Sequence, residues 1–79
     1  MSPLILYSQP DCHLCDEAVG LLHAIGLGES YRVVDIESDL ELLKRYGIHV
    51  PVLQRSDNQS ELFWPFDQLK LEVFLKDDT

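Results

Sequence analysis

The chain has 79 residues, with 14 acidic and 6 basic side chains, so its formal net charge is −8 at pH 7. Because a phosphate backbone needs a basic protein face, this balance argues against nucleic-acid binding. The hydrophobic fraction of 46% is ordinary for a globular protein, and the length suits a single domain over residues 1–79. The sequence shows neither a basic leader nor a long apolar run, so we expect a cytosolic (cytoplasmic) protein without a membrane segment.

The first predicted strand is the run Leu4-Ile5-Leu6-Tyr7, which is apolar on both faces and therefore typical of a central, fully buried strand. Pro10 ends this strand, and Asp11 is the predicted N-cap of a helix that begins near His13. Apolar residues then recur at three- and four-residue steps, as expected for one buried helix face: Leu14, Ala18, Leu21, Leu22 and Ile25. Gly26 and Gly28 end the helix.

Residues 31–36 are β-branched and aromatic and predict a second strand, parallel to the first because a helix lies between them. Ser38 and Glu41 fit a capping box at the start of a short second helix, which stops at Gly47. Its predicted core face is made by three residues, Leu40, Leu43 and Tyr46.

Residues 50–53 predict a third strand that opens with a proline, and residues 61–64 a fourth, joined by the polar turn 56–60 into a hairpin. Asp67 is the predicted N-cap of a last helix, with a hydrophobic staple between Phe66 and Leu71. The core face of that helix is Leu71, Phe74 and Leu75. The predicted order of elements is β-α-β-α-β-β-α.

The two cysteines, Cys12 and Cys15, form a C-x-x-C motif between the first strand and the first helix. A helix N-terminus favours a thiolate at Cys12, and Cys15 lies one turn further on, within reach of a disulfide. Three alternatives stay open: a static disulfide, an inert thiol pair, and half of a zinc site that includes His13 or His49. A structural zinc needs four ligands, and the chain has one C-x-x-C.

The C-x-x-C after the first strand and Val50-Pro51 at the start of the third, in this order of elements, resemble the smallest form of the thioredoxin fold. The chain is similar to the short bacterial glutaredoxin-like proteins, over nearly its whole length. The resemblance implies a thioredoxin-like (glutaredoxin-type) α/β fold, with a four-stranded mixed sheet flanked by three helices. It also implies a thiol–disulfide oxidoreductase in which Cys12 is the nucleophile and Cys15 the resolving thiol.

The resemblance further implies a cis bond before Pro51, which would leave the Val50 N–H and C=O free to pair with an extended substrate. The predicted substrate-binding residues are Val50, Pro51, His13, Leu14 and Asp67. No metal or organic cofactor is expected, since the Cys12–Cys15 disulfide itself carries the electrons. The expected partners of this monomer are disulfide-containing proteins, with glutathione or a thioredoxin-type reductase as electron donor.

The chain departs from the glutaredoxin pattern at several positions, among them Leu14 in place of the usual tyrosine inside the C-x-x-C and His49 before Val50-Pro51. Trp64-Pro65-Phe66 replaces the glycine pair that precedes the aspartate in glutathione-using members, which leaves glutathione as a co-substrate open. Gln9 replaces a common lysine upstream of the motif. Three acidic residues flank the motif, so we expect a less acidic Cys12 and a less oxidising pair than in a typical glutaredoxin. They are Asp11, Asp16 and Glu17.

Two other functions compete with the enzyme. One is a non-catalytic binding or adaptor module that keeps the fold and has lost glutathione-dependent activity. The other is a metal or cluster carrier that uses one Cys12 from each of two chains. Trp64 and Phe66 also have two interpretations, as core residues or as an apolar rim for a protein partner.

Overall fold

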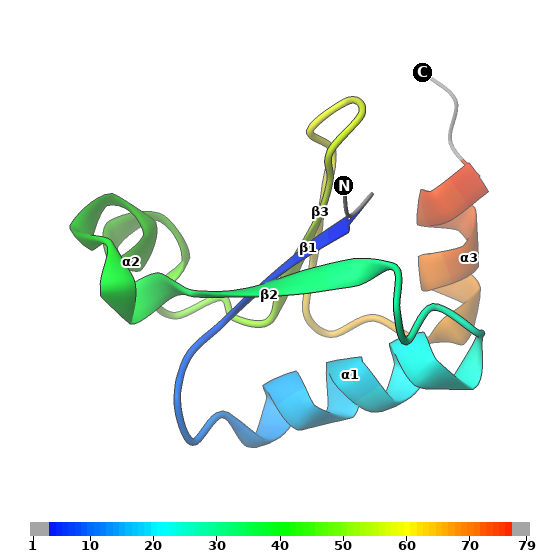
Figure 1. Cartoon of the computed structure of the whole chain (residues 1–79), viewed down its shortest axis with the longest axis horizontal. Helices are drawn as coiled ribbons and strands as arrows, with labels where there is room; N and C mark the ends of the chain where they lie inside the picture. Colours follow the sequence, from blue (N-terminus) through cyan, green and yellow to red (C-terminus); the bar gives the residue numbers. More distant parts are fainter. Residues whose placement is uncertain (1–3, 77–79) are drawn as a thin grey trace.

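A computed structural model describes residues 4–76 of the chain, and its elements follow the predicted order (Figure 1). The strands, the helices and one 3-10 helix, η1, are β1 (Leu4–Ser8), α1 (His13–Ala24), β2 (Tyr31–Asp35), η1 (Ile36–Ser38), α2 (Leu40–Tyr46), β3 (Val52–Arg55), β4 (Glu61–Phe63) and α3 (Gln68–Lys76). The predicted thioredoxin-like α/β fold is confirmed. No helix within the described range is long and apolar enough to cross a membrane.

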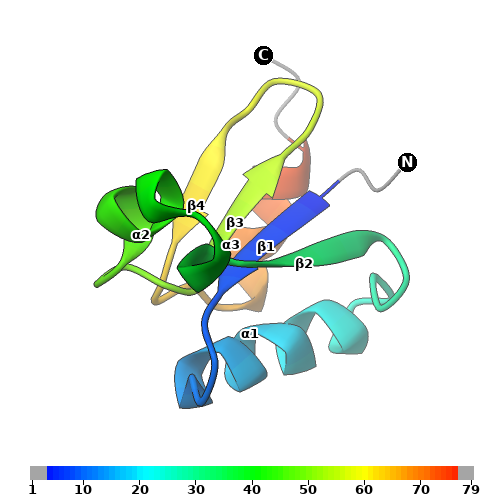
Figure 2. The same cartoon turned by 60° about the vertical axis from the view of Figure 1, so that its left-hand side comes forward.

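The four strands form one mixed sheet in the order β2-β1-β3-β4 (Figure 2). As predicted, β1 and β2 are parallel, and α1 provides the crossover that a parallel pair requires. β3 is antiparallel to β1 and to β4. In this register β1 ends at Ser8 beside Asp35, while β3 begins at Val52 beside Phe63 at the end of β4. We call this end of the sheet the site edge.

The hydrophobic core has one part on each face of the sheet. Against α1 and α3 lies the larger cluster of buried residues, Leu4, Leu6, Ala18, Leu22, Leu53, Phe66 and Leu71. On the face of α2 lies a smaller cluster, Cys15, Ile36, Tyr46, Val50 and Val52, with Tyr7, Cys12 and Leu42 packed against it. Both cysteines therefore contact the core of the α2 face.

The expectation that β1 is buried on both faces is correct for one face only. Leu4 and Leu6 are buried against α1 and α3, whereas Ile5 and Tyr7 on the other face are half-buried. The reason is the length of α2, because seven residues of helix span only about 10 Å. Figure 1 shows α2 at one end of the sheet, so it covers that face incompletely.

The predicted start of the second helix at a Ser38 capping box is wrong. Ile36 and Ser38 belong to η1, and the N-cap of α2 is Asp39, whose Oδ1 accepts the Glu41 N–H at 2.8 Å. Ser38 Oγ instead donates to the Asp35 carbonyl. The packed side of α2 carries Leu42 and Tyr46, which are four residues apart. The predicted core residues Leu40 and Leu43 lie off this side and are exposed, while Tyr46 is buried as expected, and Gly47 ends the helix.

Several strand boundaries also differ from the prediction, including the ends of β1 and β3, which lie at Ser8 and Arg55. The second strand ends at Asp35, because Ile36 begins η1. β3 begins at Val52 and not at Val50, because Pro51 has no N–H and the Val50 N–H donates to the Tyr46 carbonyl. β4 ends at Phe63, since Trp64 precedes Pro65, which cannot donate to a strand ladder.

The last helix matches its predicted start. Asp67 directly precedes α3, and its Oδ1 accepts the Lys70 N–H at 2.8 Å, so it caps the helix. Phe66 and Leu71 are buried in one cluster, as a hydrophobic staple requires. Trp64 is half-buried and meets the Phe66 ring edge-on at 4.9 Å between centroids, which supports a core role for this pair.

We predict that Asp39→Ala lowers the free energy of unfolding by about 1 kcal/mol, because it removes the N-cap of α2. Urea denaturation followed by circular dichroism measures the change. The matched control is Ser38→Ala, which should have a smaller effect, since its hydroxyl bonds an exposed carbonyl outside the helix. A larger loss in Ser38→Ala than in Asp39→Ala would contradict the observed helix start.

Candidate functional site

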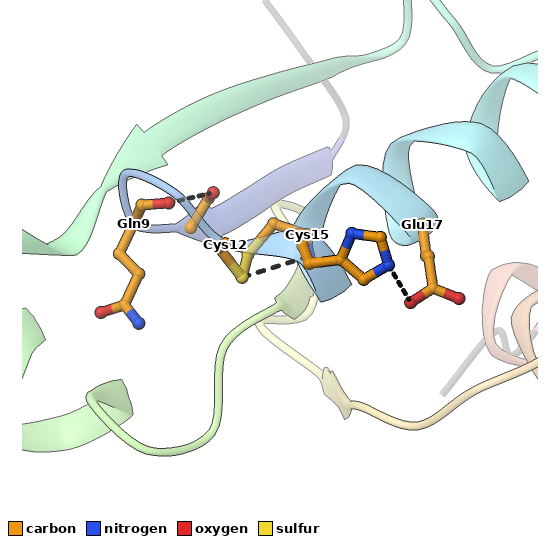
Figure 3. The surroundings of a disulfide bond; sticks show 6 residues. Gln9, Cys12, Cys15 and Glu17 are labelled. Carbon is orange, nitrogen blue, oxygen red and sulfur yellow. Dashed lines mark hydrogen bonds and ion pairs between the residues drawn. A yellow bond between two sulfur atoms is a disulfide. The ribbon is translucent and has the colours of Figure 1, made fainter.

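The two cysteines lie where β1 passes into α1, at the site edge of the sheet. The loop after β1 leads to Cys12, which is the N-cap of α1, and Cys15 lies in the first turn of that helix. They form a disulfide with 5.2 Å between their Cα atoms (Figure 3). The predicted placement of Cys12 at the helix N-terminus, with Cys15 within bonding distance, is confirmed.

Cys12 caps α1 with its sulfur. It has extended backbone angles, and its Sγ accepts the backbone N–H of Cys15 at 3.2 Å. The predicted N-cap, Asp11, is therefore wrong. Asp11 has a φ of +59°, a left-handed conformation that Asp tolerates, and it turns the chain so that the next residue starts the helix. After reduction, the same N–H can donate to a thiolate at Cys12 and stabilise its charge.

The two sulfur-bearing residues differ in exposure. Cys15 is 4% exposed and belongs to the buried cluster on the α2 face, whereas Cys12 is half-buried and lies at the rim of that cluster. A substrate disulfide can therefore approach Cys12 more easily than Cys15. This asymmetry is what a nucleophile and a resolving thiol need.

The charged groups near the motif are mostly acidic. Asp11, Asp16 and Glu17 are exposed, and His13 Nε2 lies 3.8 Å from Glu17 Oε2. His13, whose side chain is 88% exposed, therefore forms an ion pair with a carboxylate one turn along α1 whenever its imidazole is protonated. Gln9 lies on the loop before Cys12 and carries no charge (Figure 3).

The chain between α2 and β3 passes beside the disulfide (Figure 3), and Val50 packs in the same cluster as both cysteines. The bond before Pro51 is cis, as predicted. The Val50 N–H is not free, however, because it donates to the Tyr46 carbonyl at 3.2 Å, next to a shorter bond from the His49 N–H at 2.7 Å. The resemblance implies that both the N–H and the C=O of Val50 are free to pair with a substrate strand. This expectation is wrong for the N–H.

The remaining predicted binding residues occupy different positions. Leu14 was also expected to face the core, but it is 42% exposed because it lies in the first turn of α1, at the site edge. His13 is exposed beside it. Asp67 follows β4 and uses its carboxylate to cap α3. The structure thus joins Val50 to the cysteines in one cluster, whereas Asp67 has a partner in its own helix.

Tyr46 is a site component that the sequence did not indicate. Its side chain is buried in the cluster of Cys15 and Val50, stacks on Tyr7 with 4.5 Å between ring centroids, and donates its hydroxyl hydrogen to Glu61. Burial first, and then the bond to Glu61, raise its pKa to about 12. These partners lie on other elements, so sequence spacing gave no signal of the contact. Tyr46 links α2 to β1 and β4 directly behind the disulfide.

The described residues hold no group of three or more His, Cys, Asp or Glu side chains placed to bind a metal ion. The sulfur pair offers thiol–disulfide chemistry by its own geometry, since an accessible sulfur at a helix N-terminus is bonded to a buried one.

Comparison with known proteins agrees with this geometry. The model of the family described as Glutaredoxin-like domain (DUF836) matches residues 3–76. A search of curated proteins gave no match.

Three solved structures are similar to this chain. Protein XcR50 from X. campestris is 43% identical, with a TM-score of 0.81 over 91% of this chain and 93% of that one. Protein Ne2328 from Nitrosomonas europaea is 25% identical, with a TM-score of 0.77 over 94% and 93%. A glutaredoxin from Brucella melitensis is 24% identical, with a TM-score of 0.60 over 94% and 82%, a likeness of fold.

We predict that Tyr46 makes stability fall at high pH. It ionises at its ordinary pKa of 10.0 when unfolded and at about 12 when folded, so its contribution to the free energy of unfolding is complete below pH 10 and is lost between pH 10 and about 12. Chemical denaturation across this pH range should show that the free energy of unfolding declines less in Tyr46→Phe than in the wild type. The control, Tyr31→Phe, should decline as much as the wild type. Equal declines in all three proteins would contradict the prediction.

We predict that Gln9→Lys lowers the pKa of the Cys12 thiol in the reduced protein, because a cation on the loop that leads to Cys12 favours the thiolate. The measurement is the ultraviolet absorbance of the thiolate against pH in the Cys15→Ser background. Gln59→Lys adds the same charge in the β3–β4 turn, at the opposite end of the sheet, and should leave the pKa unchanged. An identical titration in both variants would refute a local electrostatic effect.

Proposed function

This chain belongs to the glutaredoxin-like domain (DUF836) family, and we propose that it is a dithiol thiol–disulfide oxidoreductase with Cys12 as nucleophile and Cys15 as resolving thiol. One observation carries the proposal: the chain's two cysteines form a disulfide at the N-terminus of α1, with Cys12 accessible and Cys15 buried. A purely structural disulfide needs no such difference in exposure, and it would bridge more distant parts of the chain to constrain the unfolded state.

The proposed reaction is two successive thiol–disulfide exchanges. The Cys12 thiolate attacks a substrate disulfide; the substrate S–S bond breaks, a mixed disulfide forms on Cys12, and the released thiolate takes a proton from water. Cys15 then loses its proton and attacks Cys12 Sγ, which releases the second substrate thiol. Two electrons move from the dithiol to the substrate, and the Cys12–Cys15 disulfide remains.

The helix N-terminus supplies the main stabilisation of the Cys12 thiolate. The Cys15 N–H lies 3.2 Å from Cys12 Sγ, and the positive end of the helix dipole is directed at the same atom. The flanking carboxylates act against this effect, so the balance leaves Cys12 a moderate nucleophile and the pair a moderate oxidant. Such a pair suits the reduction of disulfides.

The proposed substrates are disulfides of proteins and mixed disulfides, and Val50 with Pro51 would align them beside Cys12. His13, Leu14 and Asp67 are the further proposed binding residues. The reaction cycle needs no metal or organic cofactor. A thiol donor, glutathione or a thioredoxin-type reductase, would return the two electrons to the disulfide, and we propose that the protein acts as a single-domain monomer. We assign the activity to the cytoplasm, where thiol reductants maintain dithiols.

We predict that Cys15→Ser accumulates a mixed disulfide on Cys12 when it is incubated with oxidised glutathione or hydroxyethyl disulfide, because the resolving step is lost. The wild type should instead lose two hydrogens and form its internal disulfide. Intact-mass spectrometry measures both outcomes. Cys12→Ser is the matched control and should trap far less adduct, since Cys15 is 4% exposed.

Reduction of hydroxyethyl disulfide, with dithiothreitol as electron donor, tests turnover. Cys12→Ser should abolish it. The adaptor function replaces the enzyme under two conditions. The wild type would form no adduct and reduce no disulfide, and the wild type and Cys12→Ser would bind a protein partner with the same affinity.

A further inference from the structure

Three exposed apolar side chains lie on the segments that meet at the site edge, and we call them the apolar rim. Leu14 follows His13 in the first turn of α1 and is 42% exposed. Ile48, on the loop that leads to Val50, is 92% exposed, and Phe63 at the end of β4 is 42% exposed. Covering such side chains with a partner removes apolar area from water, at roughly 25 cal/mol for each Å².

The rim is continuous with the reactive sulfur. Val50 packs in one cluster with Cys12 and Cys15, which places the loop that carries Ile48 beside them. The His49 ring on that loop meets the Phe63 ring edge-on, with 5.5 Å between centroids. A partner that forms a mixed disulfide with Cys12 brings the residues next to its own cysteine onto these side chains. A protein substrate that extends from Cys12 across the site edge can therefore cover the rim during the proposed reaction.

The backbone at this point offers little to a partner strand. Pro51 has no N–H, and the Val50 N–H already donates to the Tyr46 carbonyl. Strand addition depends on alternating main-chain donors and acceptors, so an extended peptide would have to displace an internal bond here. Recognition through side chains requires no such exchange.

Acidic side chains outnumber basic ones on the segments next to the rim. β2 ends at the site edge with Asp35, η1 carries Glu37, Asp39 caps α2, and Asp11 precedes Cys12, whereas Lys44 and Arg45 lie in the last turn of α2. Ile36 of η1 packs in the cluster of Cys15, so η1 adjoins the disulfide. The formal net charge of −8 gives the long-range field the same sign. Charge complementarity therefore favours a cationic partner.

Building on the dithiol exchange proposed above, we propose that the substrate is a protein whose disulfide is flanked by an apolar side chain and by basic residues. The apolar rim would cover the apolar side chain, and the acidic groups would attract the basic ones. Oxidised glutathione is net negative and polar, so it is the disfavoured disulfide. The preference arises from side chains of this chain and does not require strand addition.

The first experiment compares disulfide-linked peptide dimers of equal length as substrates of the wild-type protein. One dimer has leucine beside the cysteine and flanking lysines, the second has leucine and flanking glutamates, and the third has serine and flanking lysines. We expect kcat/KM for the leucine–lysine dimer to exceed that for the leucine–glutamate dimer about tenfold at low salt. This ratio should shrink at high ionic strength, because salt screens exposed charges.

The second experiment assigns the preference to residues. Ile48→Ser should raise the KM for the leucine–lysine dimer about fivefold, leave kcat unchanged, and have little effect on the serine–lysine dimer. Val73→Ser is the matched control, since Val73 is 63% exposed on α3, on the other face of the sheet, and should change nothing. Glu37→Gln should reduce the preference for the leucine–lysine dimer over the leucine–glutamate dimer. Glu29 lies before the start of β2, so Glu29→Gln should leave this preference unchanged.

The outcomes separate this inference from the proposed function. Reduction of all three dimers at one rate, or equal effects of Ile48→Ser and Val73→Ser, would overturn the inference while the oxidoreductase stands. A preference for glutamate flanks or for oxidised glutathione would overturn it as well. If neither the dimers nor hydroxyethyl disulfide are reduced, the proposed function fails, and the inference with it.

Discussion

The contact between Cys12 Sγ and the Cys15 backbone N–H is the interaction on which the candidate site depends. It makes one sulfur the cap of α1 and thereby sets where the helix begins. The direction of α1 is fixed further along, where Ala18 and Leu22 are buried against the sheet. Since β1 is a central strand, the loop between strand and helix has little freedom, and the disulfide is held at the site edge.

Support for the disulfide from the other side comes through one residue of the short helix α2. Tyr46 contributes its ring to the cluster behind Cys15, its hydroxyl to Glu61 and its carbonyl to the N–H groups of His49 and Val50. A seven-residue helix has little stability of its own, so its position depends on such tertiary contacts. The loop beside the disulfide therefore depends on α2 being anchored through Tyr46.

The surroundings of the motif combine opposing electrostatic effects. The N-terminus of α1 favours negative charge on Cys12, while Asp11, Asp16 and Glu17 disfavour it, and His13 is paired with one of these carboxylates. Asp11 belongs both to this set and to the acidic groups that we propose attract a basic substrate. The basic residues of such a substrate would offset part of the repulsion when it docks, which would couple the choice of partner to the reactivity of the Cys12 thiol.

The amino-acid sequence by itself determined the order of the elements, the parallel β1–β2 pair, the hairpin and the C-x-x-C at a helix start, because these follow from hydrophobic periodicity, turn residues and local spacing. Even the cap at Asp67 is local in this sense. The tertiary structure decided that Cys12 rather than Asp11 caps α1, and that η1 moves the N-cap of α2 to Asp39. It also decided that the Val50 N–H is taken by Tyr46. At each of these positions several local hydrogen-bond partners compete on nearly equal terms, and packing of the assembled elements against the sheet selects among them.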